Sequence, residues 1–570
     1  MTGKGWLLGI LAGLIIAFFA VYPQINLQNL RGDDFEGAFA TYDLDEMAYA
    51  SYLQALIDGR PRKNDPYTGR DDSAENPQPE SLFSIQFFPA YLVAVPARIL
   101  GLSVPQVMPI LSAVSAFLTA LALFWLIVSI SENHLLAMVG TLIVLVGSAM
   151  IVGIGAINGF YEHGVAYPFF PFLRRYIPSL AFPFMFAFFA CLWNGLKTEA
   201  KEKRAVYSAF ASLCFAATVF SYFYVWTSAA AVLFALTLFV LVFRTENRRK
   251  DFLFLAITAA FCVLSLVPYA LLLASRNQTM DKAQLLVFTR QPDLLRSVEI
   301  IGYLILILLT FALWQRFTDL KEKKAYFIAA FAAAPCLVFN QQILTGRSLQ
   351  PFHYEFYAIN YVVLLAVVLI AAVFWQKFIS PKKTLSIILL SVLGIAAVGW
   401  GYIEAKETSK FWDDINVRRD EAMPVNRRLR ELAGENIEAA KHQTTLNLEA
   451  LQADSQPTVA PQAVLWARHQ HVFAGLKDWE ENRKRYYQLL YYLDLDENHL
   501  RNALTGCRDI EACMALFGWD RFNARLSANA RPLALSEVEA EVRNFAGFSQ
   551  NFSREDARNP MLSYLVVYSN

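Results

Sequence analysis

Eleven long apolar runs constrain the fold of this 570-residue chain more than any other feature. A helix needs about 20 apolar residues to span the hydrocarbon core of a bilayer, where its backbone polar groups must bond internally. The runs that come close to this length are 5–22, 106–130, 135–157, 178–196, 205–222, 224–243, 252–274, 297–315, 325–340, 357–376 and 384–402. They predict a polytopic α-helical membrane protein with about eleven transmembrane helices.

The C-terminal part of the chain has a different composition. Only 17% of all residues are charged, against roughly 25% in soluble proteins, and the deficit lies before about Tyr402. We therefore expect a transmembrane domain over 1–403 and a separate domain over 404–570. In the latter, PQAVLWARHQHVFAG is typical of strand, turn and strand, and DWEENRKRYYQLLYYLDLDENHLRNAL is typical of a helix. This combination predicts a mixed α/β domain.

Basic loops indicate which side of the membrane each segment faces. Short loops rich in Lys and Arg stay on the cytoplasmic side. Four loops have this composition: 197–204, 244–250, 316–324 and 377–383. All four fall on one side, together with the N-terminus, if the apolar segment 83–101 does not cross.

Segment 83–101 is short and is interrupted by Pro89, Pro96 and Arg98. We expect it to lie on the outer face or to dip into it. The first outer loop then spans 23–105, and the C-terminal domain is extracytoplasmic. Cys507 and Cys513 are able to form a disulfide in such a compartment, but their spacing leaves the question open.

The charge distribution excludes one class of partner. The net charge is +1, and no basic stripe interleaved with aromatic residues is present. Nucleic-acid-binding proteins need such a stripe to contact phosphates. We therefore expect membrane lipids, and no nucleic acid, among the partners.

Three carboxylates open the segment YDLDEMAYASYLQALIDG, which begins at Tyr42. Asp43 is a good helix N-cap, and Glu46 three residues later completes a capping box. Asp45 falls in the first turn, where the helix dipole favours a carboxylate. An ionised carboxylate held at a lipid–water boundary is a competent general base. The pattern fits both a simple helix start and a catalytic base at Asp45.

The same stretch resembles a known family. LDEMAYASYLQALIDG, followed by NDPYTG and a proline-bearing apolar helix, is similar to the first outer loop of GT-C superfamily glycosyltransferases. Protein O-mannosyltransferases and the lipid A aminoarabinose transferase belong to that superfamily. Asp45-Glu46, Tyr49-Ala50, Gly59 and segment 83–101 follow the family's order. The family's EKP or HPP motif before the second helix is missing here, and Glu80 is the nearest substitute.

The resemblance implies a fold and a reaction. The fold is a GT-C-like bundle with juxtamembrane helices in the first outer loop. A hexose or pentose on a polyprenyl phosphate is transferred to an acceptor, with inversion, on the outer face of a bacterial inner membrane. The acceptor is a glycan, a lipid or a protein. The resemblance assigns the base to Asp45, with Glu46 as its catalytic neighbour.

Such a reaction needs cations that stabilise the leaving phosphate, and the fork of Arg suits this role. Two outer loops carry candidates. The expected substrate-binding residues are His163, Arg174, Arg175, Arg347 and His353, with Glu80 beside them. Arg174 and Arg175 equally fit contacts with lipid headgroups. Some GT-C enzymes use a divalent cation, but no acidic spacing here forms a recognisable metal motif, so no cofactor is assigned.

Two other classes of membrane protein share this layout. A transporter or flippase often has charges at mid-membrane, and a polysaccharide polymerase needs a large loop late in the chain. Here the charges gather in the outer loops, and the later loops between apolar runs are short. The pattern therefore favours the glycosyltransferase over both alternatives.

Overall fold

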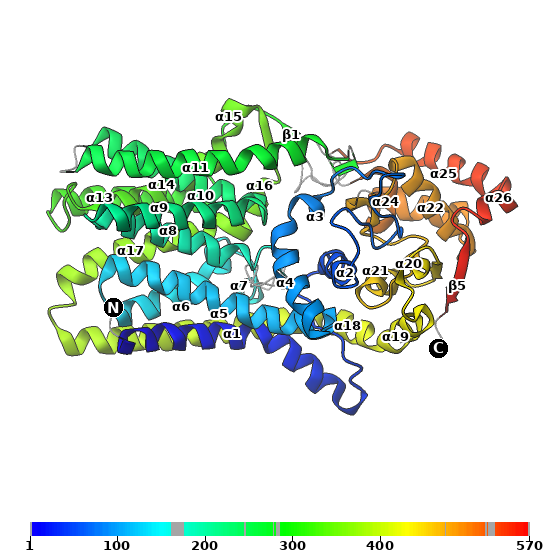
Figure 1. Ribbon diagram of the computed structural model, residues 1–570, viewed down its shortest axis with the longest axis horizontal. Coiled ribbons are helices and arrows are strands. Elements are labelled where there is room, and N and C mark those ends of the chain that lie inside the picture. Colours follow the sequence, from blue (N-terminus) through cyan, green and yellow to red (C-terminus); the bar gives the residue numbers. More distant parts are fainter. Residues whose placement is uncertain are drawn as a thin grey trace.

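The computed structural model describes residues 3–160, 176–243, 247–277, 279–280, 286–473, 475–518, 521 and 531–567. Long helices form a bundle at one end of the molecule, and a smaller domain caps the other end (Figure 1). The first outer loop lies between these two parts. This arrangement confirms the prediction of a helical membrane protein with an additional C-terminal domain.

Each of the eleven predicted segments forms a helix. These helices are α1 (Gly3–Arg31), α5 (Val104–Ser131), α6 (His134–Ile151), α8 (Ala181–Lys197), α9 (Lys201–Val219), α10 (Phe223–Val242), α11 (Arg248–Ala274), α13 (Ser297–Trp314), α14 (Lys323–Asn340), α17 (Asn360–Phe378) and α18 (Lys383–Glu421). Among the residues that the structure describes, nine helices are long and apolar enough to cross a membrane.

Helices α8 and α9 account for the difference between nine and eleven. α8 has only 17 residues, and α9 begins with the charged sequence KEKR. Both still belong to the bundle, because α8 packs against α5 and α9, and most side chains of α8 are buried. A helix enclosed by its neighbours needs less lipid-facing length than a peripheral one.

Four short helices shape the first outer loop: η1 (Gly32–Asp34), α2 (Glu46–Ile57), α3 (Leu82–Ile85) and α4 (Phe87–Leu100). Figure 1 shows α4 lying across the end of the bundle. Its exposed side chains Leu92, Val95 and Ile99 are apolar, as suits a helix in contact with lipid. Segment 83–101 thus runs along the end of the bundle, as its prolines predicted.

The later outer segments are short. Strands β1 (Leu286–Phe288) and β2 (Arg347–Leu349) pair antiparallel, with Val287 opposite Ser348. The short helix α15 (Gln342–Thr345) precedes β2, and α16 (Pro351–Tyr354) and the π-helix η3 (Glu355–Ile359), which continues into α17, follow it. Helix α7 (Ile157–Phe160) follows α6 in the chain.

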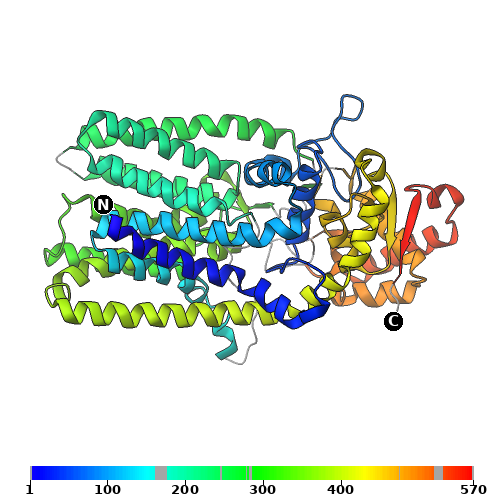
Figure 2. The same cartoon turned by 60° about the horizontal axis from the view of Figure 1, so that its bottom comes forward.

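Helix α18 joins the bundle to the C-terminal domain. It runs for 39 residues without a break, so the boundary predicted at 403/404 falls inside one helix. Figure 2 shows α18, in yellow-green, following the bundle and entering the domain.

The C-terminal domain is mixed α/β. A parallel sheet has the order β4 (Ala463–Val464), β3 (Thr444–Asn447) and β5 (Leu562–Val566). The surrounding helices are α19 (Met423–Ala433), α20 (Ile437–Ala440), α21 (Ala450–Ser455), η4 (Gln456–Thr458), η5 (Gln470–Val472), α22 (Trp479–Tyr492), α23 (Glu497–Leu504), η6 (Thr505–Cys507), α24 (Ile510–Phe517), α25 (Leu535–Gln550) and α26 (Arg554–Ala557). Cys507 and Cys513 form a disulfide.

One predicted strand is wrong. The sequence predicted a second strand after β4, but the chain there forms a loop and the short helix η5. The reason is a buried carboxylate: Asp454 Oδ1 accepts the backbone N–H of His469 at 3.3 Å, which draws the chain inward. The strand pattern of alternating apolar residues could not reveal this partner.

Ion pairs attach the first outer loop to the C-terminal domain. Arg70 lies 2.8 Å from Glu481, and the Lys441 ammonium lies 2.7 Å from Asp71. Gly69, with φ +72°, lies so close to the Lys441 carbonyl oxygen that an added Cβ would be 1.9 Å away. The loop is therefore a fixed part of the domain interface.

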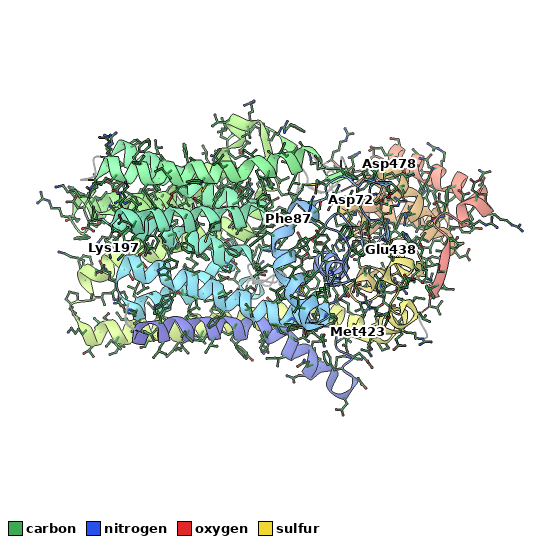
Figure 3. The ribbon with its side chains drawn as sticks, viewed as in Figure 1. Asp72, Phe87, Lys197, Met423, Glu438 and Asp478 are labelled. Atoms are coloured by element: carbon green, nitrogen blue, oxygen red, sulfur yellow. A yellow bond between two sulfur atoms is a disulfide. The ribbon has the colours of Figure 1, made fainter. Side chains whose placement is uncertain are left out.

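The basic loop that begins at Lys197 and the C-terminal domain lie at opposite ends of the bundle. Figure 3 places Lys197 at the end of the bundle remote from the domain, whereas Asp72, Glu438 and Asp478 lie at the domain end. The N-terminus shares the end of Lys197 (Figure 1).

Cysteine labelling tests this sidedness. In a background with Cys191, Cys214, Cys262 and Cys336 replaced by Ala, we expect Ala74→Cys and Glu435→Cys to react with an impermeant thiol reagent in intact cells. Lys321→Cys is expected to react only after permeabilisation, because short basic loops stay cytoplasmic. All three positions are exposed, so access through the membrane is the only difference between them. Labelling of Lys321→Cys alone in intact cells would invert the topology.

Candidate active site

The start of α2 differs in detail from the predicted capping box. The helix begins at Glu46, with Asp45 at the N-cap position. Asp43 Oδ1 accepts the backbone N–H of Asp45 at 2.9 Å, and Glu46 Oε1 accepts the backbone N–H of Tyr42 at 3.1 Å. The carboxylates of Asp43 and Glu46 thus accept backbone hydrogen bonds, as expected at the start of a helix. The N-cap residue, however, is Asp45 and not Asp43.

The side chain of Asp45 has a different environment from its neighbours. Within α2, which the structure describes in full, it accepts no capping hydrogen bond. The side chain is 58% exposed, and its Oδ1 lies 3.0 Å from Nε2 of His469 in the C-terminal domain. The N-terminus of α2 adds a positive dipole end that stabilises a carboxylate at this position.

His469 is held between two carboxylates. Its Nδ1 lies 3.1 Å from Oδ2 of Asp454, and the same oxygen lies 2.8 Å from Nη2 of Arg468. The side chain of Asp454 is 1% exposed, so its charge requires these partners. The structure therefore forms a continuous series from Asp45 through His469 to Asp454 and Arg468.

Electrostatics favour the imidazolium form of His469. Burial of the ring is the largest influence and opposes protonation, but the Asp454 and Asp45 carboxylates together outweigh it and raise the pKa of His469 above its usual value. Burial likewise opposes ionisation of Asp454, but His469 and Arg468 lower the pKa of that carboxyl below its usual value. A protonated ring, hydrogen-bonded to Asp45 through Nε2 and ion-paired with Asp454, is the state that this arrangement stabilises.

His471 has the opposite behaviour. Burial lowers its pKa to about 4, so its ring is neutral at physiological pH. The ring packs edge-on against Trp479, with 5.6 Å between the centroids. We assign it a packing role.

A cavity of about 340 Å³ lies beside this series of charges. Its lining residues are Leu44, Asp414, Ile415, Arg418, Glu449, Leu451, Asp454, Arg468 and Glu511. Asp454 and Arg468 belong both to the cavity wall and to the surroundings of His469. The cavity and the Asp45 carboxylate therefore share one polar cluster.

The structure places the other predicted site residues as follows. Glu46 is 1% exposed, which suits its backbone bond more than contact with a substrate. Glu80 is buried and lies 2.6 Å from Arg62, and its Oε2 accepts the Ser84 hydroxyl at 2.5 Å, so it anchors the start of α3.

The candidates from the later loops occupy other surroundings. Arg347 is exposed on β2, with its guanidinium 5.7 Å from the centre of the Phe288 ring. The His353 ring lies among aromatic rings, 4.9 Å from Tyr224 and 5.0 Å from Tyr357. His163, Arg174 and Arg175 lie outside the described residues.

His469 and Asp454 were not predicted from the sequence, because 424 residues separate His469 from Asp45 and no motif links them.

Across the described ranges, no group of three or more His, Cys, Asp or Glu residues is placed to hold a metal ion.

Comparison with known proteins gives matches among solved structures only. No family model and no curated protein matches the chain. The crystal structure of the Archaeoglobus fulgidus oligosaccharyltransferase, in complex with Zn and sulfate, is similar at 12% identity and a TM-score of 0.45, over 84% of this chain and 69% of that one. The crystal structure of ArnT from Cupriavidus metallidurans, bound to undecaprenyl phosphate, is similar at 13% identity and a TM-score of 0.38, over 100% and 97%.

The raised pKa of His469 predicts a pH-dependent contribution to stability. The contribution is complete below the unfolded-state pKa of about 6.5 and is lost as pH rises through the higher folded-state pKa. We expect His469→Gln to lower the melting temperature by at least about 2 °C at pH 6, and by less at pH 9. Thermal unfolding of the purified protein at both pH values measures this.

His442→Gln is the matched control, because the side chain of His442 is 63% exposed. It is expected to leave the melting temperature unchanged at both pH values. A destabilisation by His469→Gln that grows between pH 6 and pH 9 would contradict the imidazolium assignment.

Proposed function

We propose that the chain is a GT-C-type glycosyltransferase that transfers a sugar from a polyprenyl phosphate to an acceptor at the outer face of a membrane, with Asp45 as general base. One observation carries the proposal. The Asp45 carboxylate is exposed on one side and held by a buried histidine on the other, at the end of the bundle where the C-terminal domain docks.

The position of Asp45 suits a donor that has an apolar part and a polar part. A polyprenyl tail requires hydrocarbon, whereas the phosphate and sugar require a polar surface. Helix α2, which begins beside Asp45, packs against α4, and α4 exposes the apolar side chains Leu92, Val95 and Ile99. A base on α2 is therefore next to a lipid-facing helix, where such a donor would present its sugar.

The reaction proceeds by displacement at the anomeric carbon. An acceptor hydroxyl attacks that carbon while its proton passes to Asp45, and the bond between the carbon and the phosphate oxygen breaks. The electron pair of that bond remains on the departing polyprenyl phosphate. Attack from the side opposite the leaving group inverts the anomeric configuration.

His469 acts on Asp45 as a positioning residue. The imidazolium bonds Oδ1 of Asp45 and so fixes the orientation of the carboxylate that would face the acceptor. Asp454 fixes the orientation of the ring from behind, as a carboxylate does for the histidine of a hydrolase triad. The C-terminal domain thereby contributes to the active site directly.

The leaving phosphate must be bound by cationic side chains. Arg347 is a candidate because its guanidinium is exposed. His163, Arg174, Arg175 and His353 remain candidates from the sequence pattern. Any divalent cation stays unassigned.

The proposed location is a bacterial inner membrane, with the C-terminal domain outside the cytoplasm. The disulfide between Cys507 and Cys513 supports an oxidising compartment for the domain. The basic loop that begins at Lys197, at the opposite end of the bundle, supports the same orientation.

Substitution of Asp45 separates a base from a helix cap. We expect Asp45→Asn to express and fold normally and to lose about 10²–10⁴-fold in transfer rate, because the amide keeps the shape but cannot accept the proton. The measurement is release of radiolabelled sugar from the polyprenyl-phosphate donor that the wild-type protein consumes in nanodiscs.

Asp43→Asn and Glu46→Gln are the matched controls. Each amide oxygen still accepts the backbone N–H that the carboxylate accepts, so both variants are expected to keep activity within about threefold of the wild type. Retention of more than about a tenth of the activity by Asp45→Asn would move the base elsewhere, because a lost general base costs at least about 10²-fold.

A further inference from the structure

The cavity beside His469 has walls from five parts of the chain. α18 contributes Asp414, Ile415 and Arg418, the segment around α21 contributes Glu449, Leu451 and Asp454, and Leu44, Arg468 and Glu511 complete the lining. Its volume of about 340 Å³ is at the lower end of pockets that bind small molecules. It has the size for one or two sugar rings rather than for a folded partner.

The cavity lies within reach of the proposed base. Leu44 immediately precedes Asp45, and Asp454 in the cavity wall contacts Nδ1 of His469, whose Nε2 contacts Asp45. The imidazole ring of His469 therefore connects the cavity wall to the proposed base. A group extending past that ring would present a hydroxyl to Asp45.

The polar lining selects against anions. Four carboxylates face two guanidinium groups, and Arg468 is already paired with Asp454. Arg468 also lies 3.9 Å from Glu511, which leaves Asp414 and Glu449 against Arg418. A phosphate or uronic acid placed here would meet an excess of negative charge.

The same lining suits hydroxyl groups. Carboxylate oxygens accept hydrogen bonds from sugar hydroxyls, and the guanidinium of Arg418 donates to hydroxyl oxygens. Leu44, Ile415 and Leu451 add an apolar patch that suits the C–H face of a sugar ring.

We propose that this cavity binds the terminal sugar of the acceptor, and that the acceptor is an uncharged glycan. The inference rests on the proposed function and narrows its acceptor class. Free glycans and lipid-linked glycans would both present the same group to the cavity, a terminal sugar without charge.

The test compares acceptors that differ only in charge. The full chain in nanodiscs receives the donor that it consumes, with a panel of neutral disaccharides and the uronic acid and phosphate ester of each. Every glycan is supplied both free and lipid-linked, and kcat/KM is measured for each. We expect neutral acceptors to exceed their anionic counterparts at least about tenfold, as one close charge repulsion requires.

Charge reversal in the lining should change this preference. Glu511→Arg is expected to reduce the tenfold preference to about threefold or less, whereas Glu435→Arg, on the exposed surface outside the cavity, should leave it unchanged. Hydrolysis of the donor by water reports whether each variant is folded. If the Glu511→Arg variant no longer hydrolyses the donor, Asp414→Arg is used in its place, because Asp414 is exposed on α18 and its replacement should not disturb folding.

Two outcomes would overturn the inference: anionic acceptors used as well as neutral ones by the wild type, or equal effects of Glu511→Arg and Glu435→Arg. Neither outcome touches the assignment of the base. Donor consumption that survives Asp45→Asn refutes the proposed function itself. Donor consumption that requires Asp45 but shows no preference for neutral sugars refutes only the acceptor class.

Discussion

The buried charge of Asp454 determines how the C-terminal domain meets the first outer loop. A carboxylate with a 1% exposed side chain is stable only when cations surround it, and Arg468 and His469 provide them. Holding His469 there turns its other nitrogen toward Asp45. The Tyr67 hydroxyl donates to the Asp454 carbonyl oxygen at 3.0 Å, so the first outer loop contacts the same residue through its backbone. One buried acid thus orders both sides of the proposed active site.

The bundle was largely predictable because its determinants are local. Apolar length decides which segments cross a bilayer, and prolines with Arg98 distinguish α4 from a crossing helix. α8 shows the limit of this reasoning, since its short length is compensated by burial against α5 and α9, which sequence alone does not display.

The site was predictable only on the side of α2. The acidic pattern identified Asp45, since a carboxylate beyond those needed for capping was visible in the sequence. His469 and Asp454 depend on contacts between distant segments, and the segment around His469 looks like a strand because its apolar residues alternate. Glu80 was a candidate site residue because of its position in the sequence, and in the structure it forms an ion pair with Arg62. Charge pairing across the chain, rather than local pattern, decided each of these outcomes.

Because α18 is one continuous helix, it connects the bundle directly to the wall of the cavity. From Lys383 to Asp414 the helix rises about 46 Å, so a tilt of about 3° at the membrane displaces the cavity wall by roughly 2 Å. Helices tilt when bilayer thickness changes, to keep their apolar length in hydrocarbon. A tilt of α18 would therefore change the width of the space beside Asp45, which makes lipid composition a physical variable of the geometry of this site.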